Sequence, residues 1–238
     1  MRAVLFDVDF TLIYPGPTFQ GQGYRAFCEQ HGLIVDESRF ELGIAAAAGI
    51  LDGPGDPYDA EVFVAYTRRI IETMGGTGER VDACARQIYD EWAACHHFHL
   101  YDEVPDVLRA LSQAGMRIGL VSNSHRCLAS FQSHFELDGL IDAAISSPEH
   151  GFLKPNPSIF RAALELLSVN AREAVMVGDS VTQDVEGALA AGMRAVLLHR
   201  GAQPHRQQSA LAAAGVPVIN SLHEVPAVVR AFSQAASP

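Results

Sequence analysis

The sequence contains no apolar run that approaches the roughly 20 residues needed to cross a lipid bilayer. Near its start, the short run Ala3–Phe6 is ended at once by Asp7 and Asp9, so it cannot form the apolar centre of a secretory signal peptide. We therefore expect a protein that neither enters a membrane nor carries an export signal.

Clusters of basic residues are also missing. The 238 residues include 17 Lys and Arg against 28 Asp and Glu, which gives a net charge of −11. Nucleic acids and anionic membranes are bound through clustered Lys and Arg side chains that replace counterions, so we expect neither as a partner. An acidic protein can still bind an anionic substrate where a metal ion, or one or two well-placed lysines, supplies positive charge locally.

Cysteine is scarce as well. Cys28, Cys84, Cys95 and Cys127 occur at irregular spacing and form no CxxC pair. In a chain of this length without an export signal, such cysteines are expected to be buried free thiols and not a disulfide framework. This usage favours the reducing environment of the cytoplasm.

What the sequence does contain is an ordinary globular composition, with 48% apolar and 19% charged residues. Short apolar runs alternate with helical stretches over most of the chain, which is typical of a parallel α/β sheet. Asn156 followed by Pro157 predicts the start of one helix. Six runs are expected to be strands: Ala3–Phe6, Arg117–Val121, Ala143–Ile145, Ala174–Val177, Ala195–Leu198 and Pro217–Ile219.

Residues 15–100 break this alternation and contain no clear strand. Glycine and proline interrupt the segment at residues 53–57 and 75–78. We expect a small helical domain here, inserted after the first strand, while residues 1–14 and 101–238 form the α/β core. Two apolar stripes at helical spacing support this: Phe63, Tyr66, Ile70 and Met74, and then Val81, Cys84, Ala85, Ile88, Trp92 and Cys95.

Two carboxylates follow the first predicted strand directly, at Asp7 and Asp9. Two acids at the end of an apolar strand are costly unless a cation neutralises them, and carboxylate oxygens suit magnesium. A carboxylate can also attack a phosphoryl group as a nucleophile. Taken alone, the pair could equally be two turn-forming aspartates.

Three more segments follow predicted strands or precede predicted helices. Ser122 and Asn123 form a strand–helix turn that can bind an anion, and Lys154 stands just before the helix that starts at Pro157. Asp179 ends another strand, and Asp184 falls in the first turn of the next helix. Each could be a helix cap or a solvated side chain. Together they gather at the carboxyl ends of parallel strands, where open α/β sheets bind ligands.

The type and order of these residues resemble those of the haloacid dehalogenase-like hydrolases. That family has DxDxT after the first strand, a Ser or Thr after the second, then a Lys, and finally GDxxxxD. Here these elements are Asp7, Asp9 and Thr11, then Ser122, then Lys154, and finally Gly178-Asp179 with Asp184. The resemblance covers residues 1–14 and 101–200, and it implies a Rossmann-like core with a helical cap domain inserted after the first strand.

The resemblance implies that Asp7 is the nucleophile and Asp9 the general acid and base. It also implies a magnesium ion held by Asp7, by the backbone carbonyl of Asp9 and by Asp179. Asp184 would orient bound water or Lys154 from outside the metal ligands. The implied reaction is hydrolysis of a phosphate monoester through an aspartyl phosphate.

Phosphate oxygens would be bound by Ser122, by backbone amides near Asn123 and by Lys154, while Thr11 would brace the turn that aims Asp9. A small cap excludes macromolecular substrates, so a small-molecule phosphate is expected. Asp9 argues against dehalogenation, because relatives that cleave carbon–halogen bonds lack an aspartate at this position. A sugar-phosphate mutase of the same fold and a silent binding module stay open, and the sequence does not indicate an oligomeric state.

Overall fold

The computed structural model describes residues 1–51, 53–201, 203 and 205–235, and it divides into two compact units. The first unit comprises Met1–Tyr14, Pro54–Asp56 and everything from Leu100 onward. The second comprises Pro15–Gly53 and Pro57–His99. No helix in the described ranges is long and apolar enough to span a membrane.

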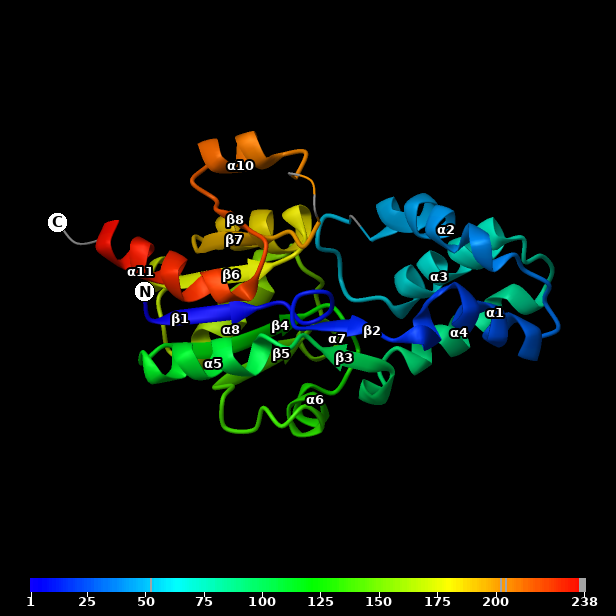
Figure 1. Ribbon diagram of the computed structural model, residues 1–238, viewed down its shortest axis with the longest axis horizontal. Coiled ribbons are helices and arrows are strands. Elements are labelled where there is room, and N and C mark those ends of the chain that lie inside the picture. The colour runs from blue at the N-terminus through cyan, green and yellow to red at the C-terminus, as the bar shows by residue number, and fades with distance from the viewer. Residues whose placement is uncertain (52, 202, 204, 236–238) are drawn as a thin grey trace. The chain divides into compact units, whose positions relative to one another are not determined.

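The first unit is built on a six-stranded parallel sheet with the order β5-β4-β1-β6-β7-β8 (Figure 1). This confirms the predicted fold class, and each predicted strand is present within one residue of its expected ends. The strands are β1 (Ala3–Phe6), β4 (Arg117–Ser122), β5 (Ala143–Ser146), β6 (Ala174–Gly178), β7 (Arg194–Leu198) and β8 (Val218–Ile219).

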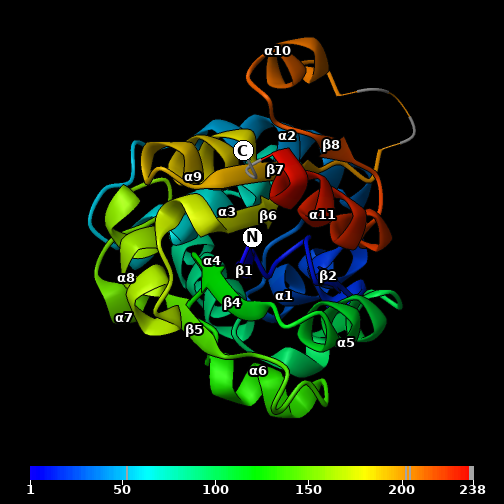
Figure 2. The same cartoon turned by 90° about the vertical axis from the view of Figure 1, so that its left-hand side faces the viewer.

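Helices cover both faces of this sheet. Figure 2 shows α8 (Pro157–Leu167) and α9 (Gly187–Ala190) on one face, and α5 (Val104–Gln113) and α11 (Val225–Ala235) on the other. All four residues of β1 are buried as a result, which explains why this strand is a continuous apolar run. The remaining helical segments are α6 (Leu128–His134), α7 (Ser147–His150), a π-helical turn at Val181–Glu186, α10 (Gln208–Ala213), and single turns at Ala171–Glu173 and Leu222–Glu224.

The core between the sheet and α8 is tightly interlocked. Leu5 of β1 and Met176 of β6 pack in one cluster with Phe160 and Leu167 of α8. Helix α8 begins as predicted, because the side chain of Asn156 accepts a hydrogen bond from the amide of Ser158 at 3.0 Å. This packing fixes the start of α8, and therefore fixes the segment that carries Lys154.

The second unit consists mainly of helices: α1 (Gly21–Gln30), α2 (Phe40–Ala47), α3 (Ala60–Met74) and α4 (Arg80–Glu91), with single turns at Pro17–Phe19, Glu37–Arg39, Ala48–Ile50 and Cys95–His97. Helix α4 buries the predicted stripe from Val81 to Ile88, but it ends at Glu91, so Trp92 and Cys95 of that stripe lie beyond the helix and are only half-buried. Helix α3 differs, since Val64 and Thr67 are buried where Phe63 and Tyr66 were expected. Over the first half of α3, the buried positions therefore lie one residue later than predicted.

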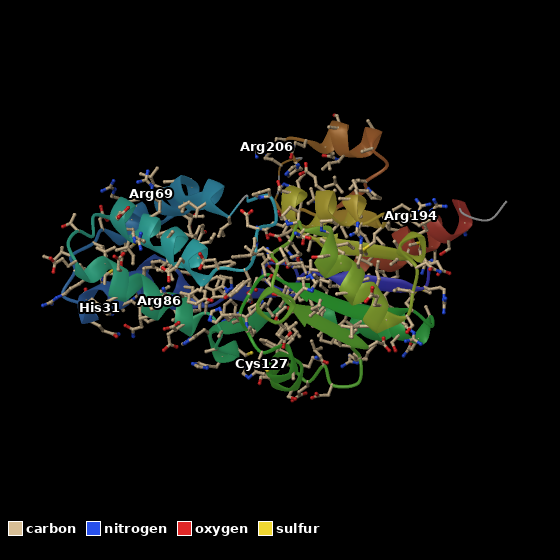
Figure 3. The ribbon with its side chains drawn as sticks, turned by 180° about the vertical axis from the view of Figure 1, so that it is seen from behind. His31, Arg69, Arg86, Cys127, Arg194 and Arg206 are labelled. Carbon is tan, nitrogen blue, oxygen red and sulfur yellow. The ribbon has the colours of Figure 1, made fainter. Side chains whose placement is uncertain are left out.

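Two short strands were not predicted. β2 (Ile13–Pro15) pairs with β3 (Phe98–Leu100) in a two-stranded sheet, and two of the boundaries between the units, after Tyr14 and after His99, fall within these strands. The free cysteines also differ from expectation. Cys28 and Cys84 are buried with sulfurs 3.9 Å apart, but Cys127 before α6 is exposed (Figure 3).

Candidate active site

The predicted site residues follow strands that are neighbours in the sheet. Phe6, the last residue of β1, pairs with Leu120 of β4 on one side and with Val177 of β6 on the other. Asp7 therefore lies between the ends of β4 and β6, and its amide donates to the carbonyl of Val177 at 3.0 Å. Three strand ends thus converge on Asp7.

Lys154 lies at the centre of this cluster and is almost completely buried. Its ammonium Nζ donates to Oδ1 of Asp7 at 2.6 Å and to Oδ1 of Asp184 at 2.7 Å. Burial disfavours the charged form, but the carboxylates of Asp184 and Asp7 outweigh it and raise the pKa of Lys154. Lys154 is therefore a permanent cation in contact with two acids, and the alternative of a solvated surface lysine is wrong.

Asp184 is held as firmly on its other side. Its Oδ2 accepts a hydrogen bond from the amide of Ser180 at 3.0 Å. A side chain at Gly178 would bring Cβ to 2.2 Å from this oxygen, so only glycine fits at the end of β6. Burial raises the pKa of Asp184 to about 6, against the opposing effect of Lys154.

Oxygen atoms of Asp7, Asp179 and Asp184 lie within 4.8 Å of one another. Three carboxylates at this spacing are a hard, anionic donor set, which suits magnesium. Asp179 is the solvent-exposed member of the three, yet desolvation by the surrounding groups, followed by the charges of Asp7 and Asp184, raises the pKa of Asp179, so a cation would relieve the repulsion. The residues present therefore fit the magnesium ion that the sequence predicted, and Asp184, which also accepts from Lys154 as the sequence predicted, lies in the same cluster.

The side chain of Asp9 faces a different partner. Its Oδ1 accepts a hydrogen bond from Nη1 of Arg126 at 2.9 Å, and the Arg126 side chain is fully buried. Burial raises the pKa of Asp9, the Arg126 guanidinium opposes this, and the charge of Asp7 adds to the rise. Sequence reasoning missed Arg126, because an arginine four residues after Ser122 has no spacing signal that distinguishes it from a surface residue.

Asn123 braces the lysine segment through its side chain. Its Oδ1 accepts from the amide of Lys154 at 2.7 Å and from the hydroxyl of Ser147 at 2.6 Å, and its Nδ2 donates to the carbonyl of Lys154 at 3.2 Å. The side chain is thus committed to the protein, which leaves the backbone amide as the phosphate donor to expect here. Ser122 beside it is buried, and its hydroxyl accepts from the amide of Ser124 at 3.1 Å.

A segment from the middle of the chain also supports Lys154. The carbonyl of Gly55 accepts from Nδ2 of Asn156 at 2.9 Å, and the carbonyl of Asp56 accepts from the amide of Leu153 at 3.1 Å. Gly55 has φ +85°, and a Cβ there would meet the amide nitrogen of Asn156 at 2.3 Å. The glycine and proline of this loop, which the sequence shows as a break in the helical insert, allow a close approach to the site segment.

Thr11 contributes through its backbone. Within the described part of the chain its buried hydroxyl has no hydrogen-bond partner, but its carbonyl accepts from Nη2 of Arg200 at 3.2 Å. Arg200 in turn pairs with Glu103 at 2.7 Å and lies 3.6 Å above the ring centre of Tyr101. The turn after Asp9 is therefore braced by an arginine from the end of β7.

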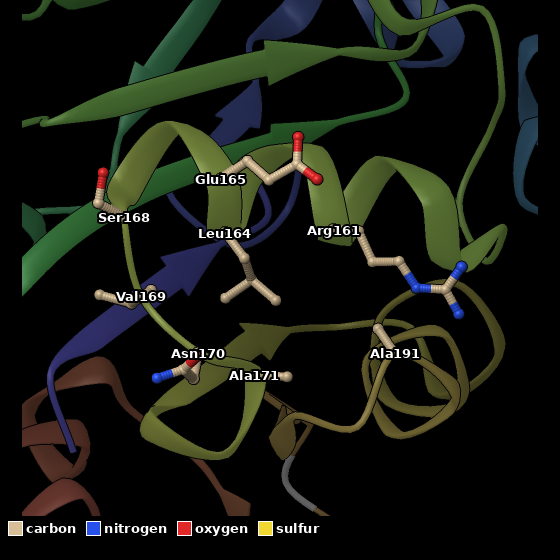
Figure 4. Close-up of a pocket in the computed structure, with 8 residues that line it drawn as sticks. All are labelled: Arg161, Leu164, Glu165, Ser168, Val169, Asn170, Ala171 and Ala191. Atoms are coloured by element: carbon tan, nitrogen blue, oxygen red, sulfur yellow. The ribbon is translucent and has the colours of Figure 1, made fainter.

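A shallow hollow of about 380 Å³ lies at the far end of α8, lined by residues such as Arg161, Glu165 and Asn170 (Figure 4). None of the predicted site residues lines it. Lys154 precedes the first turn of α8, whereas this hollow is formed around the last turn and the loop that follows. It is therefore separate from the chemistry described above.

Comparison with known proteins gives one consistent family. A model of the haloacid dehalogenase-like hydrolases matches residues 1–192. A ribulose-1,5-bisphosphate 5-phosphatase from Halopiger xanaduensis is 29% identical over 213 residues, which are 87% of this chain and 89% of that protein. A phosphoserine phosphatase from Thermus thermophilus is 34% identical over 155 residues, or 62% of this chain and 57% of that protein.

Solved structures agree on the fold. A HAD phosphatase from Thermococcus onnurineus superposes with a TM-score of 0.65 at 23% identity, over 96% of this chain and 98% of that one. A 2-haloacid dehalogenase from Pseudomonas syringae gives 0.63 at 21% identity, over 98% and 99%. Since both reactions occur among proteins of this shape, the fold alone does not choose between them.

Proposed function

The chain belongs to the haloacid dehalogenase-like hydrolases, and we propose that within this family it is a magnesium-dependent phosphatase that hydrolyses a small-molecule phosphate monoester. The observation that carries the proposal is the contact of Lys154 with Asp7 and Asp184 at the end of β1. Asp7 contacts a buried ammonium and also belongs to an acidic cluster that can bind a cation. Both positive charges would attract an anionic phosphoryl group to this nucleophile. The relatives named as phosphatases support this reaction class.

In the proposed reaction Asp7 attacks phosphorus. A bond forms between its carboxylate oxygen and phosphorus while the bond to the leaving oxygen breaks, and Asp9 gives its proton to that oxygen. Water then attacks the phosphorus of the aspartyl phosphate and gives a proton back to Asp9. The bond between Asp7 and phosphorus breaks, inorganic phosphate leaves, and both carboxyl groups are restored.

Asp9 suits the acid–base role because of its surroundings. Burial raises its pKa, which favours the protonated form needed for the first step. Arg126 stabilises the ionised form left after that step, and its contact at 2.9 Å also fixes the direction of the carboxyl group. The two carboxyl groups of the DxD pair are thus separated by their environments into two roles.

Asp7, Asp179 and Asp184 would hold the magnesium ion by their carboxylates, together with the backbone carbonyl of Asp9. When bound, the ion would screen the repulsion between Asp7 and the phosphate and stabilise charge in the transfer. Ser122, the backbone amide at Asn123 and Lys154 would bind the non-bridging phosphate oxygens.

Asp9 also favours phosphate chemistry over dehalogenation, because dehalogenases of this family lack an aspartate at the matching position. A phosphomutase would keep it, so that alternative needs an experiment. We further propose that the helical unit acts as the family's cap, which limits the enzyme to small substrates, and that the free thiols reflect a cytoplasmic protein.

The test is a panel of metabolite phosphates with magnesium, in which released inorganic phosphate is measured. Asp7→Asn should lose essentially all turnover while keeping its folded-state spectrum, whereas the exposed surface variant Asp106→Asn should match the wild type. With an isotopically labelled phosphate ester as substrate, label recovered as inorganic phosphate supports the phosphatase. Label recovered on another hydroxyl of a sugar supports the mutase. Full activity of Asp7→Asn would refute the nucleophile.

A further inference from the structure

Phe10, the residue between Asp9 and Thr11, has an unusual backbone. Its φ is +64°, in the left-handed region that a bulky side chain rarely adopts. The residue is nevertheless 46% exposed to solvent, so full burial does not hold its side chain in place. A strained and exposed aromatic residue next to a catalytic group calls for a functional explanation.

The turn itself dictates this conformation. The amide of Phe10 donates to the carbonyl of Ile13 at 2.7 Å, and the amides of Leu12 and Ile13 both donate to the carbonyl of Val8, at 2.8 and 3.1 Å. With Arg200 bound to the carbonyl of Thr11, the backbone on both sides is fixed. Residue 10 must therefore have positive φ, and glycine would adopt it without strain.

The other residues with this backbone show how such positions are usually filled. Among the described residues, the non-glycine positions with positive φ besides Phe10 are Glu136 (55°) and Ser168 (52°). Both are polar, and Ser168 caps the end of α8. Phe10 is the hydrophobic exception, and it stands in the one of these three turns that carries a proposed catalytic residue.

A second aromatic side chain is exposed on the same segment. Tyr14 is 39% exposed, and its ring packs on Tyr101 at a centroid distance of 4.8 Å. The stretch that leads away from Asp9 thus shows two exposed aromatic rings within five residues of chain. Water-exposed aromatic surface of this kind is suited to contact with a flat apolar group.

We propose that Phe10 is a specificity-determining residue that contacts the leaving group of the substrate and favours leaving groups with an aromatic or other flat apolar face. The inference rests on the proposed function. Asp9 would protonate the leaving oxygen, and Phe10 is its direct neighbour in the chain. On this ground we place Phe10 on the leaving-group side of the reaction, whereas Ser122 and Lys154 would bind the phosphate.

The test compares two alkyl phosphates, 2-phenylethyl phosphate and n-propyl phosphate, whose leaving groups are both primary alcohols but only one of which has a ring. The wild type should prefer the phenylethyl ester in kcat/KM. Phe10→Gly and Phe10→Asn, which both tolerate positive φ, should lower that preference roughly tenfold, mainly through KM, as expected when about one stacking contact is lost. Phe10→Trp, which keeps an aromatic ring at this position, should retain the wild-type preference.

Ser168→Gly is the matched control, because it relieves the same backbone strain far along the chain from the site. Both glycine variants should raise the melting temperature, but only Phe10→Gly should change the substrate preference. An unchanged preference in Phe10→Gly and Phe10→Asn, or an equal loss with both esters, would overturn the role of Phe10 alone. A wild-type protein that releases phosphate from neither ester nor from the metabolite panel would overturn the proposed function as well.

Discussion

Arg126 and Asp9, which are 117 residues apart in the chain, form an ion pair of 2.9 Å in which the arginine side chain is closed off from solvent. Removing one member of such a pair leaves a buried charge without its partner, and this is costly. The pair therefore links the stability of the core to the position of the proposed general acid. It also makes the two residues dependent on each other in a way that can be measured.

A double-mutant cycle tests this dependence. Arg126→Met should lower the free energy of unfolding by about 3 kcal/mol, because Asp9 loses the charge that compensates it. The double variant Arg126→Met/Asp9→Asn should be no less stable than Arg126→Met alone, so the two effects should fall short of additivity by about 1–3 kcal/mol. Urea unfolding measures all four proteins. Strict additivity would show that the contact has no energetic weight.

Glu103 gives a pH-dependent prediction within the same unit. Burial opposes its charge, but hydrogen bonds from Ser221 and the amide of Leu222, with the Arg200 guanidinium, hold the pKa of Glu103 below its ordinary value of 4.5. A carboxyl whose pKa is lowered by folding adds stability above its ordinary pKa, and this stability is lost as the pH falls through the folded-state value.

Glu103→Gln should therefore unfold about 1 kcal/mol more easily than the wild type at pH 7, and the difference should shrink as the pH falls below about 4.5. Urea unfolding at pH 7 and at pH 4 measures it. Glu165→Gln, an exposed glutamate of α8, should show little change at either pH. If the difference in unfolding free energy between Glu103→Gln and the wild type grew on acidification, folding would not lower the pKa of Glu103.

Magnesium dependence is tested at the acidic cluster. Chelation with EDTA should abolish phosphate release, and added magnesium should restore it. Asp179→Asn removes one of three clustered carboxylates, so it should require at least about tenfold more magnesium for half-maximal rate, as a lost ligand would. A magnesium titration followed by thermal shift reports binding without turnover. Full activity after rigorous chelation would exclude the metal.

Much of the fold could be predicted because its signals are local. Ala3–Phe6 and Ala174–Gly178 are buried on both faces, so they read as continuous apolar runs. The strands β2 and β3 have three residues each, too few for any periodic pattern. The buried face of α3 depends on which of two adjacent positions packs against the neighbouring helices. The spacing of apolar residues within one helix does not decide that.

In the candidate site, too, some residues could be predicted from the sequence and others could not. Asp7, Lys154 and Asp184 could be predicted to meet, because they stand at ends of neighbouring elements in a parallel sheet. Arg126 could not, since its role depends on a contact with Asp9 across 117 residues of chain. Asn123 was placed in the site, but its use as a brace for Lys154 follows from tertiary hydrogen bonds that the sequence does not contain.

Asp9 provides the sharpest test of mechanism, because the proposal gives it two separate tasks. It protonates the leaving oxygen in the first step and accepts a proton from water in the second. Asp9→Asn can do neither. With p-nitrophenyl phosphate the leaving group departs without protonation, so the first step should suffer less than the second.

The aspartyl phosphate of Asp9→Asn should then accumulate. It would appear as a burst of p-nitrophenol that approaches one equivalent of enzyme, followed by a steady rate lower than that of the wild type by about 10²–10⁴-fold. The mass of the intact protein after rapid acid quench should show the added phosphoryl group, and Asp7→Asn/Asp9→Asn should show none.

The partner of Asp9 complicates this experiment in a predictable way. In Asp9→Asn the buried Arg126 loses its carboxylate, so the variant must first be shown to be folded and to bind magnesium with near wild-type affinity. A folded, magnesium-loaded Asp9→Asn that turns over at the wild-type rate would remove Asp9 from the mechanism. A folded variant with a slow steady rate and no burst would restrict Asp9 to the first step, because the phosphoenzyme would then form slowly and break down at its normal rate.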